Sequence, residues 1–303
     1  MENPLTPPEP TPIFDRLPAW GNAETQMDDM PASDSGLRVF LLGSPRDWVA
    51  KVFYNRCAQA GHSVRFFENL EGFEPDSDDP VPPEERPHVV LTCQHDTFEY
   101  LSLGEFFHFM PLAEDGILLM SALGTTGYDA PLPVNAEESR LVMFSPLAFF
   151  AERYQVEMAP ALNTAPDATR AAQQFFASVG LQTHVLKDSP GFIFPRVFAC
   201  LVNEACFALM EGVATAEAID TAMTLGTRYP QGPLRWADKV GLDVVLNILN
   251  NLYAEYTEER YRPCRLLKEK VLSDHLGMKT GQGFYRYADV PYQRESSRLL
   301  GDF

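Results

Sequence analysis

Five short apolar runs recur through the first half of this 303-residue chain and constrain its fold more than any other feature. They occupy residues 38–43, 64–68, 88–93, 116–120 and 140–144. A helical stretch that reaches Ala60 separates the first run from the second. Each run has the length and composition of a strand that is buried on both faces. Strands that alternate with helices predict a parallel, doubly wound α/β sheet.

The chain becomes wholly helical in character after Ser189. One apolar stripe at helical spacing comprises Phe198, Leu201, Val202, Ala205 and Leu209. Two hydroxyls also suggest helix starts, with Thr164 before one predicted helix and Thr215 before another. We therefore predict two domains, a Rossmann-like domain at 37–187 and an all-helical domain at 188–287.

Both ends of the chain are predicted to be tails, residues 1–36 and 288–303. The first tail has seven acids, seven prolines and one base, which is typical of a disordered segment. Together with residues 71–85 it carries 13 of the 18 net negative charges. This acidity favours solubility and argues against binding nucleic acid or an anionic membrane.

No segment of the sequence suggests membrane insertion or secretion. Apolar runs fall short of the roughly 18–20 residues that span a bilayer, and no basic start followed by an apolar stretch marks a signal peptide. The five cysteines, at 57, 93, 200, 206 and 264, form no CxxC pair and have no metal-like histidine spacing. We expect free thiols in the cytoplasm, with neither a disulfide nor a metal site.

Three glycine-rich or acidic motifs mark the C-terminal half. They are GMKTGQGFY at 277–285, YPQGP at 229–233 and ADKVGLD at 237–243. With PGFI, NEA and EGVA from residue 190 onward, they resemble the C-terminal domain of the 3-hydroxyacyl-CoA dehydrogenase family. That resemblance implies an N-terminal Rossmann domain, NAD as cofactor, acyl-CoA as ligand and a homodimer formed through 188–287. The family reaction is NAD-dependent oxidation of 3-hydroxyacyl-CoA to 3-ketoacyl-CoA, a step of fatty acid metabolism.

The cofactor motif departs from this resemblance. A dinucleotide turn needs Gly-x-Gly-x-x-Gly so that the backbone can approach the pyrophosphate. Gly43 holds the first glycine position, but Pro45 and Trp48 hold the second and third. Arg46 could bind a phosphate in compensation. Glu68, 25 residues after Gly43, is either the acid that binds the ribose or an ordinary carboxylate at a strand end.

The catalytic motif departs as well. The family uses a His paired with a Glu as general acid and base, because an imidazole titrates near neutrality. The family motif His-Phe-Phe-Asn-Pro aligns with residues 142–146, which places Val142 at the His position. Glu157 falls at the Glu position and lacks its partner, since residues 109–183 contain no histidine. Pro195 holds the position of a family Asn.

Other candidate groups lie on loops. The catalytic Ser position of the family falls on Gly124, with the hydroxyl of Thr125 beside it. His95 follows the third predicted strand and is either a replacement base or a surface histidine. The basic arm that helps to hold CoA is missing, and residues 87–139 contain no Lys or Arg. CoA is a polyanion, and proteins usually bind its phosphate groups through such cationic side chains.

Three functions remain open on these residues. The first is a degenerate family member, a pseudoenzyme that serves as a dimeric binding or scaffold protein. The second is an active NAD-dependent dehydrogenase with unusual cofactor contacts and another base. The third is a different reaction in the same site that uses Glu157 and the threonines.

Overall fold

The computed structural model describes six segments of the chain, residues 36–43, 48–67, 81–93, 111–122, 139–147 and 155–287. Apart from Gly36, the two predicted tails lie outside these segments.

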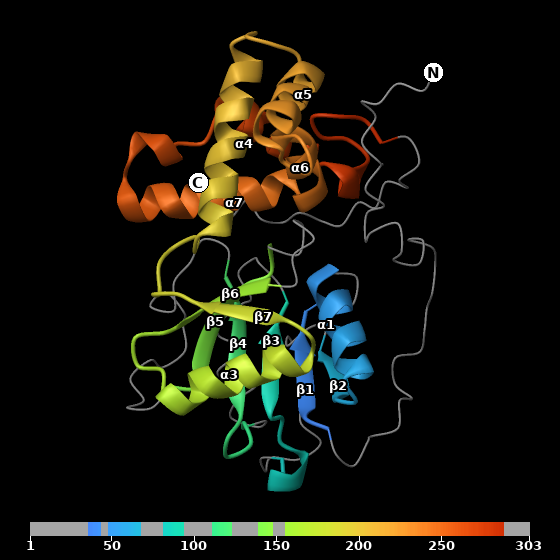
Figure 1. Cartoon of the computed structure of the whole chain (residues 1–303), viewed down its shortest axis with the longest axis vertical. Helices are drawn as coiled ribbons and strands as arrows, with labels where there is room; N and C mark the ends of the chain where they lie inside the picture. The colour runs from blue at the N-terminus through green and yellow to red at the C-terminus, as the bar shows by residue number, and fades with distance from the viewer. Residues whose placement is uncertain are drawn as a thin grey trace, which may run out of the picture. The chain divides into compact units, whose positions relative to one another are not determined.

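A single mixed sheet organises the first half of the described chain (Figure 1). Its strands are β1 (Arg38–Leu42), β2 (Ser63–Phe67), β3 (Val89–Thr92), β4 (Ile117–Ser121), β5 (Leu141–Ser145), β6 (Gln155–Pro160) and β7 (Gln182–Val185). They are ordered β2-β1-β3-β4-β5-β6-β7. The first five pair in parallel with their neighbours, which confirms the predicted α/β class.

The sequence does not predict the last two strands, β6 and β7. β6 runs antiparallel to β5, and β7 runs parallel to β6. Glu157 interrupts the apolar residues of β6, and most of β7 is exposed at the edge of the sheet. Neither strand therefore shows the continuous apolar run that marks a strand buried on both faces.

Helices α1 (Trp48–Gln59) and α3 (Pro166–Ser178) cover one face of the sheet and share one hydrophobic cluster with it (Figure 1). Phe53 of α1, Phe144 of β5 and Phe176 of α3 meet there, all fully buried. Their ring centroids lie 5.6 to 6.1 Å apart with tilted or edge-on planes. Such pairs stabilise a core beyond the area that they bury.

The start of α3 differs from the prediction. Ala165 is its N-cap and no side chain caps it. The Thr164 hydroxyl instead donates to the carbonyl of Leu141 in β5. The predicted cap at Thr164 is wrong because a strand carbonyl competes for the same hydroxyl.

All elements described after β7 are helical. They are α4 (Phe194–Met210), α5 (Ala216–Thr227), α6 (Pro233–Val240), α7 (Leu242–Tyr256), α8 (Arg265–Leu272) and the 3₁₀ turns η4 (Glu259–Tyr261) and η5 (Met278–Thr280). A further 3₁₀ turn, η2 (Pro83–Glu85), lies in the first half of the chain, before β3. Phe198, Val202 and Ala205 form the buried face of α4, as their spacing predicts. The Thr215 hydroxyl accepts the Ala218 N–H at 3.3 Å, which confirms the predicted cap of α5.

Asp238 of α6 holds the glycine-rich motif at the C-terminal end of the helical region. Its carboxylate is almost fully buried and accepts the backbone N–H groups of Phe284 at 2.8 Å and Tyr285 at 2.9 Å. A Cβ at position 283 would lie 2.0 Å from Asp238 Oδ1, so only Gly283 fits. The glycine at 283 is therefore required because the backbone of the motif approaches a buried carboxylate closely and donates hydrogen bonds to it.

Asp220 of α5 anchors the neighbouring YPQGP motif in the same manner. It accepts the backbone N–H groups of Leu234 at 2.8 Å and Arg235 at 2.9 Å, and the hydroxyl of Tyr285 at 2.8 Å. These contacts belong to the architecture of the helical region. The sequence motifs of the helical region are therefore explained by its fold, and they are not by themselves evidence of a reaction.

The described helices include none long and apolar enough to cross a membrane. The five cysteines lie within the described segments, where none of them forms a disulfide and four are buried.

Candidate functional site

Polar side chains gather at the edge where the parallel strands end. Thr92, Ser121 and Ser145 are the last residues of β3, β4 and β5. Because β6 runs the opposite way, its third residue, Glu157, lies at the same edge. Open α/β sheets bind their ligands at this carboxyl edge. These four residues, the carboxyl-edge set, define the candidate site.

Glu157 is the ionisable member of the set, and the start of α4 holds its carboxylate. The oxygens accept the backbone N–H of Ile193 at 3.2 Å and that of Phe194 at 3.0 and 3.1 Å. The residue is 9% exposed. Burial raises its pKa, while the two N–H donors and the nearby His184 act in the opposite direction. The carboxylate is therefore a helix anchor in this structure.

Ser145, rather than Val142, stands opposite Glu157. The antiparallel ladder pairs Ser145 with Glu157 and Val142 with Pro160. Val142 is fully buried in the cluster beneath α1 and α3. The register therefore places Ser145, and not Val142, across the ladder from Glu157. The assignment of the family His position to Val142 stays a prediction.

Thr92 and Ser121 tie the ends of β3 and β4 together. Both are largely buried, and the Thr92 hydroxyl oxygen accepts the Ser121 N–H at 3.0 Å. The sequence analysis missed Thr92 and Ser145 as site residues. Their signal was available, since each is the polar residue that closes an apolar strand.

Gly43 is the part of the cofactor turn that the structure describes. It follows β1 with φ of +146°, a conformation that favours glycine, and its N–H donates to the Phe67 carbonyl at 2.9 Å. α1 then begins at Trp48, so the third glycine position carries an indole at the first residue of the helix. Residues 44–47 lie outside the described segments, so the effect of Pro45 and Trp48 on a bound dinucleotide stays a prediction.

Four predicted site residues lie outside the described segments. These are Arg46, Glu68, His95 and Thr125. Their roles stay predictions.

Pro195 lies in the first turn of α4 and is buried. A first-turn proline costs no hydrogen bond, because N–H groups there have no helical partner. The backbone N–H groups beside it, of Ile193 and Phe194, donate to the Glu157 carboxylate. Pro195 thus shapes the helix start where the family has an amide side chain.

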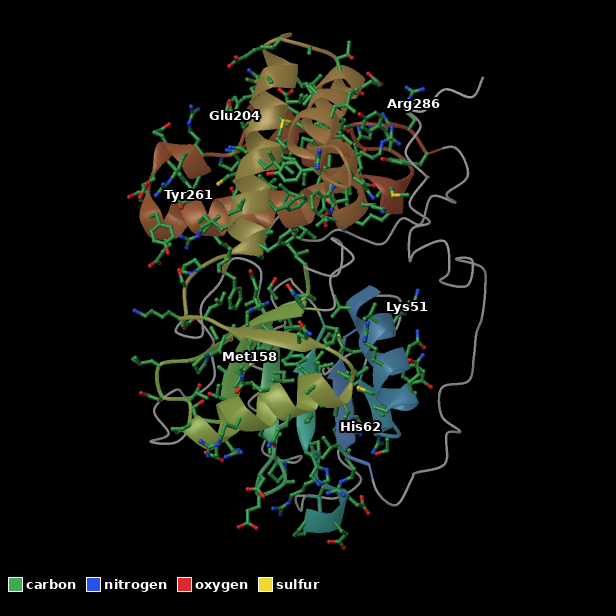
Figure 2. All side chains as sticks on the ribbon, in the orientation of Figure 1. Lys51, His62, Met158, Glu204, Tyr261 and Arg286 are labelled. Carbon is green, nitrogen blue, oxygen red and sulfur yellow. The ribbon has the colours of Figure 1, made fainter. Side chains whose placement is uncertain are left out.

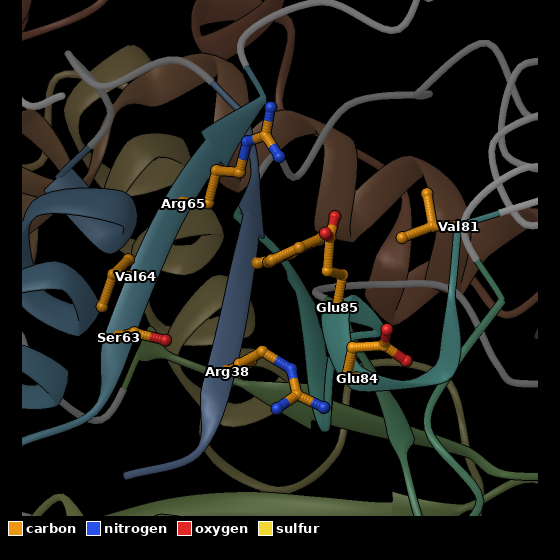
Figure 3. Close-up of a pocket in the computed structure, with 8 residues that line it drawn as sticks. Arg38, Ser63, Val64, Arg65, Val81, Glu84 and Glu85 are labelled. Carbon is orange, nitrogen blue, oxygen red and sulfur yellow. The ribbon is translucent and has the colours of Figure 1, made fainter. Parts of the chain in front are cut away.

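A pocket of about 260 Å³ lies elsewhere, beside the first residues of β1 and β2 (Figure 3). Arg38 and Arg65 line it from the strands, and Glu84 and Glu85 from η2. Arg38 Nε donates to the Arg86 carbonyl at 2.7 Å, and Arg65 lies over the Phe67 ring. Its mixed charges sit at the amino end of the strands, away from the carboxyl-edge set.

Comparison with known proteins places the helical region in a family. Residues 191–287 match the family model described as 3-hydroxyacyl-CoA dehydrogenase, C-terminal domain. The chain is 42% identical over 132 residues to 3-hydroxybutyryl-CoA dehydrogenase of Bradyrhizobium diazoefficiens, which is 44% of this chain and 45% of that protein. It is 39% identical over 134 residues to a probable 3-hydroxybutyryl-CoA dehydrogenase of Bacillus subtilis, which is 44% of this chain and 47% of the relative. The matches span about half the length of these relatives.

The fold extends the likeness beyond the helical region. The crystal structure of (S)-3-hydroxybutyryl-CoA dehydrogenase from Ralstonia eutropha superposes with a TM-score of 0.68 over 84% of this chain and all of that chain, at 23% identity. At this identity the match speaks for the fold alone. Residues 191–287, less than half of the chain, are thus similar to the C-terminal domain of the 3-hydroxyacyl-CoA dehydrogenase family.

Proposed function

We propose that this protein is a dimeric binding or scaffold member of the family that has lost its histidine-dependent hydride transfer. The observation that carries the proposal is the pairing of Ser145 with Glu157. Abstracting a proton from a 3-hydroxyl needs a base that titrates near neutrality. A serine hydroxyl does not titrate near neutrality and so does not meet that need.

The surroundings of Glu157 support the same proposal. Its two oxygens already accept N–H groups from the start of α4. A carboxylate used in this way stabilises the helix start and has less capacity to orient an imidazole. The broken glycine turn at Pro45 and Trp48 adds independent support, because it removes the approach that a pyrophosphate requires.

Exposed apolar side chains support a homodimer formed through the helical region. Val197 of α4, Val213, Leu225 of α5 and Leu272 of α8 are between 58% and 78% exposed. Association through this region would cover side chains of this kind. We also propose a cytoplasmic location, because five cysteines without a CxxC pair suit a reducing compartment.

The bound partner that we propose is an acyl-CoA or another small acyl ligand, by analogy with the family. Titration calorimetry with NADH and, separately, with acetoacetyl-CoA tests it, on protein whose dimeric state is checked by light scattering. The proposal expects no heat from NADH and no NADH oxidation with acetoacetyl-CoA. Micromolar NADH binding with turnover would overturn it.

One observation favours a second candidate, an active dehydrogenase with a relocated base. His184 of β7 is the Cα partner of Glu157 on the side away from Ser145. It acts electrostatically on that carboxylate and is exposed. If the wild-type protein oxidises NADH, His184→Ala should abolish most of that rate, whereas His275→Ala should leave it unchanged.

A further inference from the structure

The pocket beside the first residues of β1 and β2 has an apolar floor. Phe40 of β1 lines it, is 6% exposed and belongs to the hydrophobic cluster on the sheet face opposite α1 and α3. Val81, which packs against the same cluster, lines the pocket as well. The volume of about 260 Å³ is below the roughly 300–1,000 Å³ of pockets that take drug-sized ligands, so this one suits a smaller molecule. We call it the amino-end pocket.

The surroundings of Arg38 hold its guanidinium at the pocket. Its Nε donates to the Arg86 carbonyl at 2.7 Å, and its backbone N–H donates to Nδ1 of His88 at 3.0 Å. Arg86 is fixed in turn, because its own Nε donates to the Val81 carbonyl at 3.1 Å. The side chain of Arg38 is bound through Nε, and its two Nη groups form the pair of donors that a carboxylate accepts side by side.

Arg65 brings a second guanidinium to the same pocket. Phe40 and Arg65 are Cα partners in the ladder between β1 and β2, and Arg38 stands two residues before Phe40 on the same face of the sheet. The guanidinium carbon of Arg65 lies 5.2 Å from the centroid of the Phe67 ring. That ring lies 5.1 Å from the ring of Phe40. Stacking on an aromatic ring orients the second cation beside the apolar floor.

Two carboxylates line the pocket across from the arginines. Figure 3 shows Glu84 and Glu85 on η2, opposite the strands that carry Arg38 and Arg65. Both glutamates are exposed, so a ligand can reach them from solvent. With two cations and two anions the lining is neutral as a whole. A simple anion would be repelled by the glutamates and a simple cation by the arginines, whereas a small dipolar molecule can satisfy both pairs.

We propose that the amino-end pocket binds a free α-amino acid with an apolar side chain. The carboxylate of the ligand pairs with Arg38 and Arg65, and its ammonium group with Glu84 and Glu85. The apolar side chain packs on Phe40. A free amino acid carries both charges on one carbon, whereas a peptide separates them at its two ends. The pocket lies away from the carboxyl-edge set, so this inference does not depend on the function proposed above.

Titration calorimetry of L-leucine into the full-length chain tests the proposal. Wild-type protein should show one saturable site. Two analogues each lack one charge, since 3-methylbutylamine has no carboxylate and 4-methylpentanoate has no ammonium group. Each should bind about tenfold or more weakly than L-leucine, because one charge-assisted set of hydrogen bonds is lost. Glycine keeps both charges and should also bind about tenfold or more weakly, because it lacks the side chain that packs on the floor.

Two variants assign the charges to their partners. Arg65→Gln should weaken L-leucine about tenfold or more and bind 3-methylbutylamine no more weakly than the wild type does. The double variant Glu84→Gln, Glu85→Gln should weaken L-leucine to a similar extent and bind 4-methylpentanoate no more weakly. Arg170→Gln is the matched control, because Arg170 is exposed on α3 at the other face of the sheet. It should bind L-leucine as the wild type does.

Far-UV circular dichroism verifies that each variant is folded, and the analogues test the proposal on the wild type without any substitution. Saturable binding of L-leucine that depends on both of its charges, with the losses expected in the variants, supports the proposal. It is overturned if the wild type shows no saturable binding of L-leucine, if either analogue binds as well as L-leucine, or if both pocket variants bind L-leucine unchanged.

Discussion

Ser145 and Glu157 face each other as Cα partners in the antiparallel ladder between β5 and β6. The backbone N–H groups of Ile193 and Phe194 donate to the Glu157 carboxylate. Glu157 therefore joins the carboxyl edge of the sheet to the start of α4.

Glu157→Ala should destabilise the protein by about 1–3 kcal/mol, because it leaves two N–H groups at the start of α4 without their acceptor. Glu157→Gln keeps one acceptor oxygen and should cost less than half of that. Urea unfolding measures both. Glu204, an exposed acid on the same helix (Figure 2), supplies the control. Glu204→Ala should change the free energy of unfolding by no more than about 0.5 kcal/mol. Equal losses in the free energy of unfolding for Glu157→Ala and Glu204→Ala would contradict the role of Glu157 as an anchor of α4.

Asp238→Ala should cost about 3 kcal/mol, because two backbone N–H groups and the hydroxyl of Tyr287 lose a charged acceptor inside the helical region. Thermal and urea unfolding give the value. Glu269, exposed and paired with Arg265, provides a comparison. Glu269→Ala should cost less than about 1 kcal/mol, as exposed ion pairs do. A small loss at Asp238 would mean that the glycine-rich motif is held by other contacts.

Acid should weaken the sheet domain through His62 and His88. Each imidazole Nδ1 accepts a backbone N–H, from Leu37 at 3.3 Å and from Arg38 at 3.0 Å. Burial lowers the pKa of both, and Arg38 lowers that of His88 further. The unfolded chain protonates histidine near pH ~6.5, so it takes up more protons than the folded chain below that value. Stability should therefore be full above about pH 6.5 and fall as the pH decreases.

Urea midpoints measured between pH 8 and pH 5.5, a range chosen to bracket ~6.5, follow this decline. In the double variant His62→Gln, His88→Gln, the amide oxygens can still accept the N–H groups but cannot take up the proton. The decline should be shallower in the variant. Parallel curves for the two proteins would rule out these histidines as its source.

Asn203→Ala should cost about 2–3 kcal/mol, because the Cys264 N–H and the Arg262 carbonyl would both lose their partner. Asn203→Asp retains the acceptor but sets a carboxylate against the Arg262 carbonyl, so it should not rescue the loss. Urea unfolding is again the measurement. The exposed Asn250 of α7 is the reference. Asn250→Ala should be neutral or slightly stabilising by helix propensity.

The sequence by itself determined the α/β class, the five parallel strands and the family of the helical region. These features are local, since an apolar run, a helix stripe or a short glycine-rich motif is encoded by neighbouring residues. Glu157 and Gly43 could be singled out in the same way. β6 and β7 could not, because Glu157 and the exposure of β7 conceal their pattern.

Tertiary structure alone decided which residues meet. The strand register brought Ser145 rather than Val142 opposite Glu157, and the packing of α4 against the start of α8 brought Met210 to Cys264 across more than fifty positions of sequence. The physical reason is that register and helix packing depend on hydrogen bonds and contacts between distant segments. Composition and spacing along the chain carry no record of those partners.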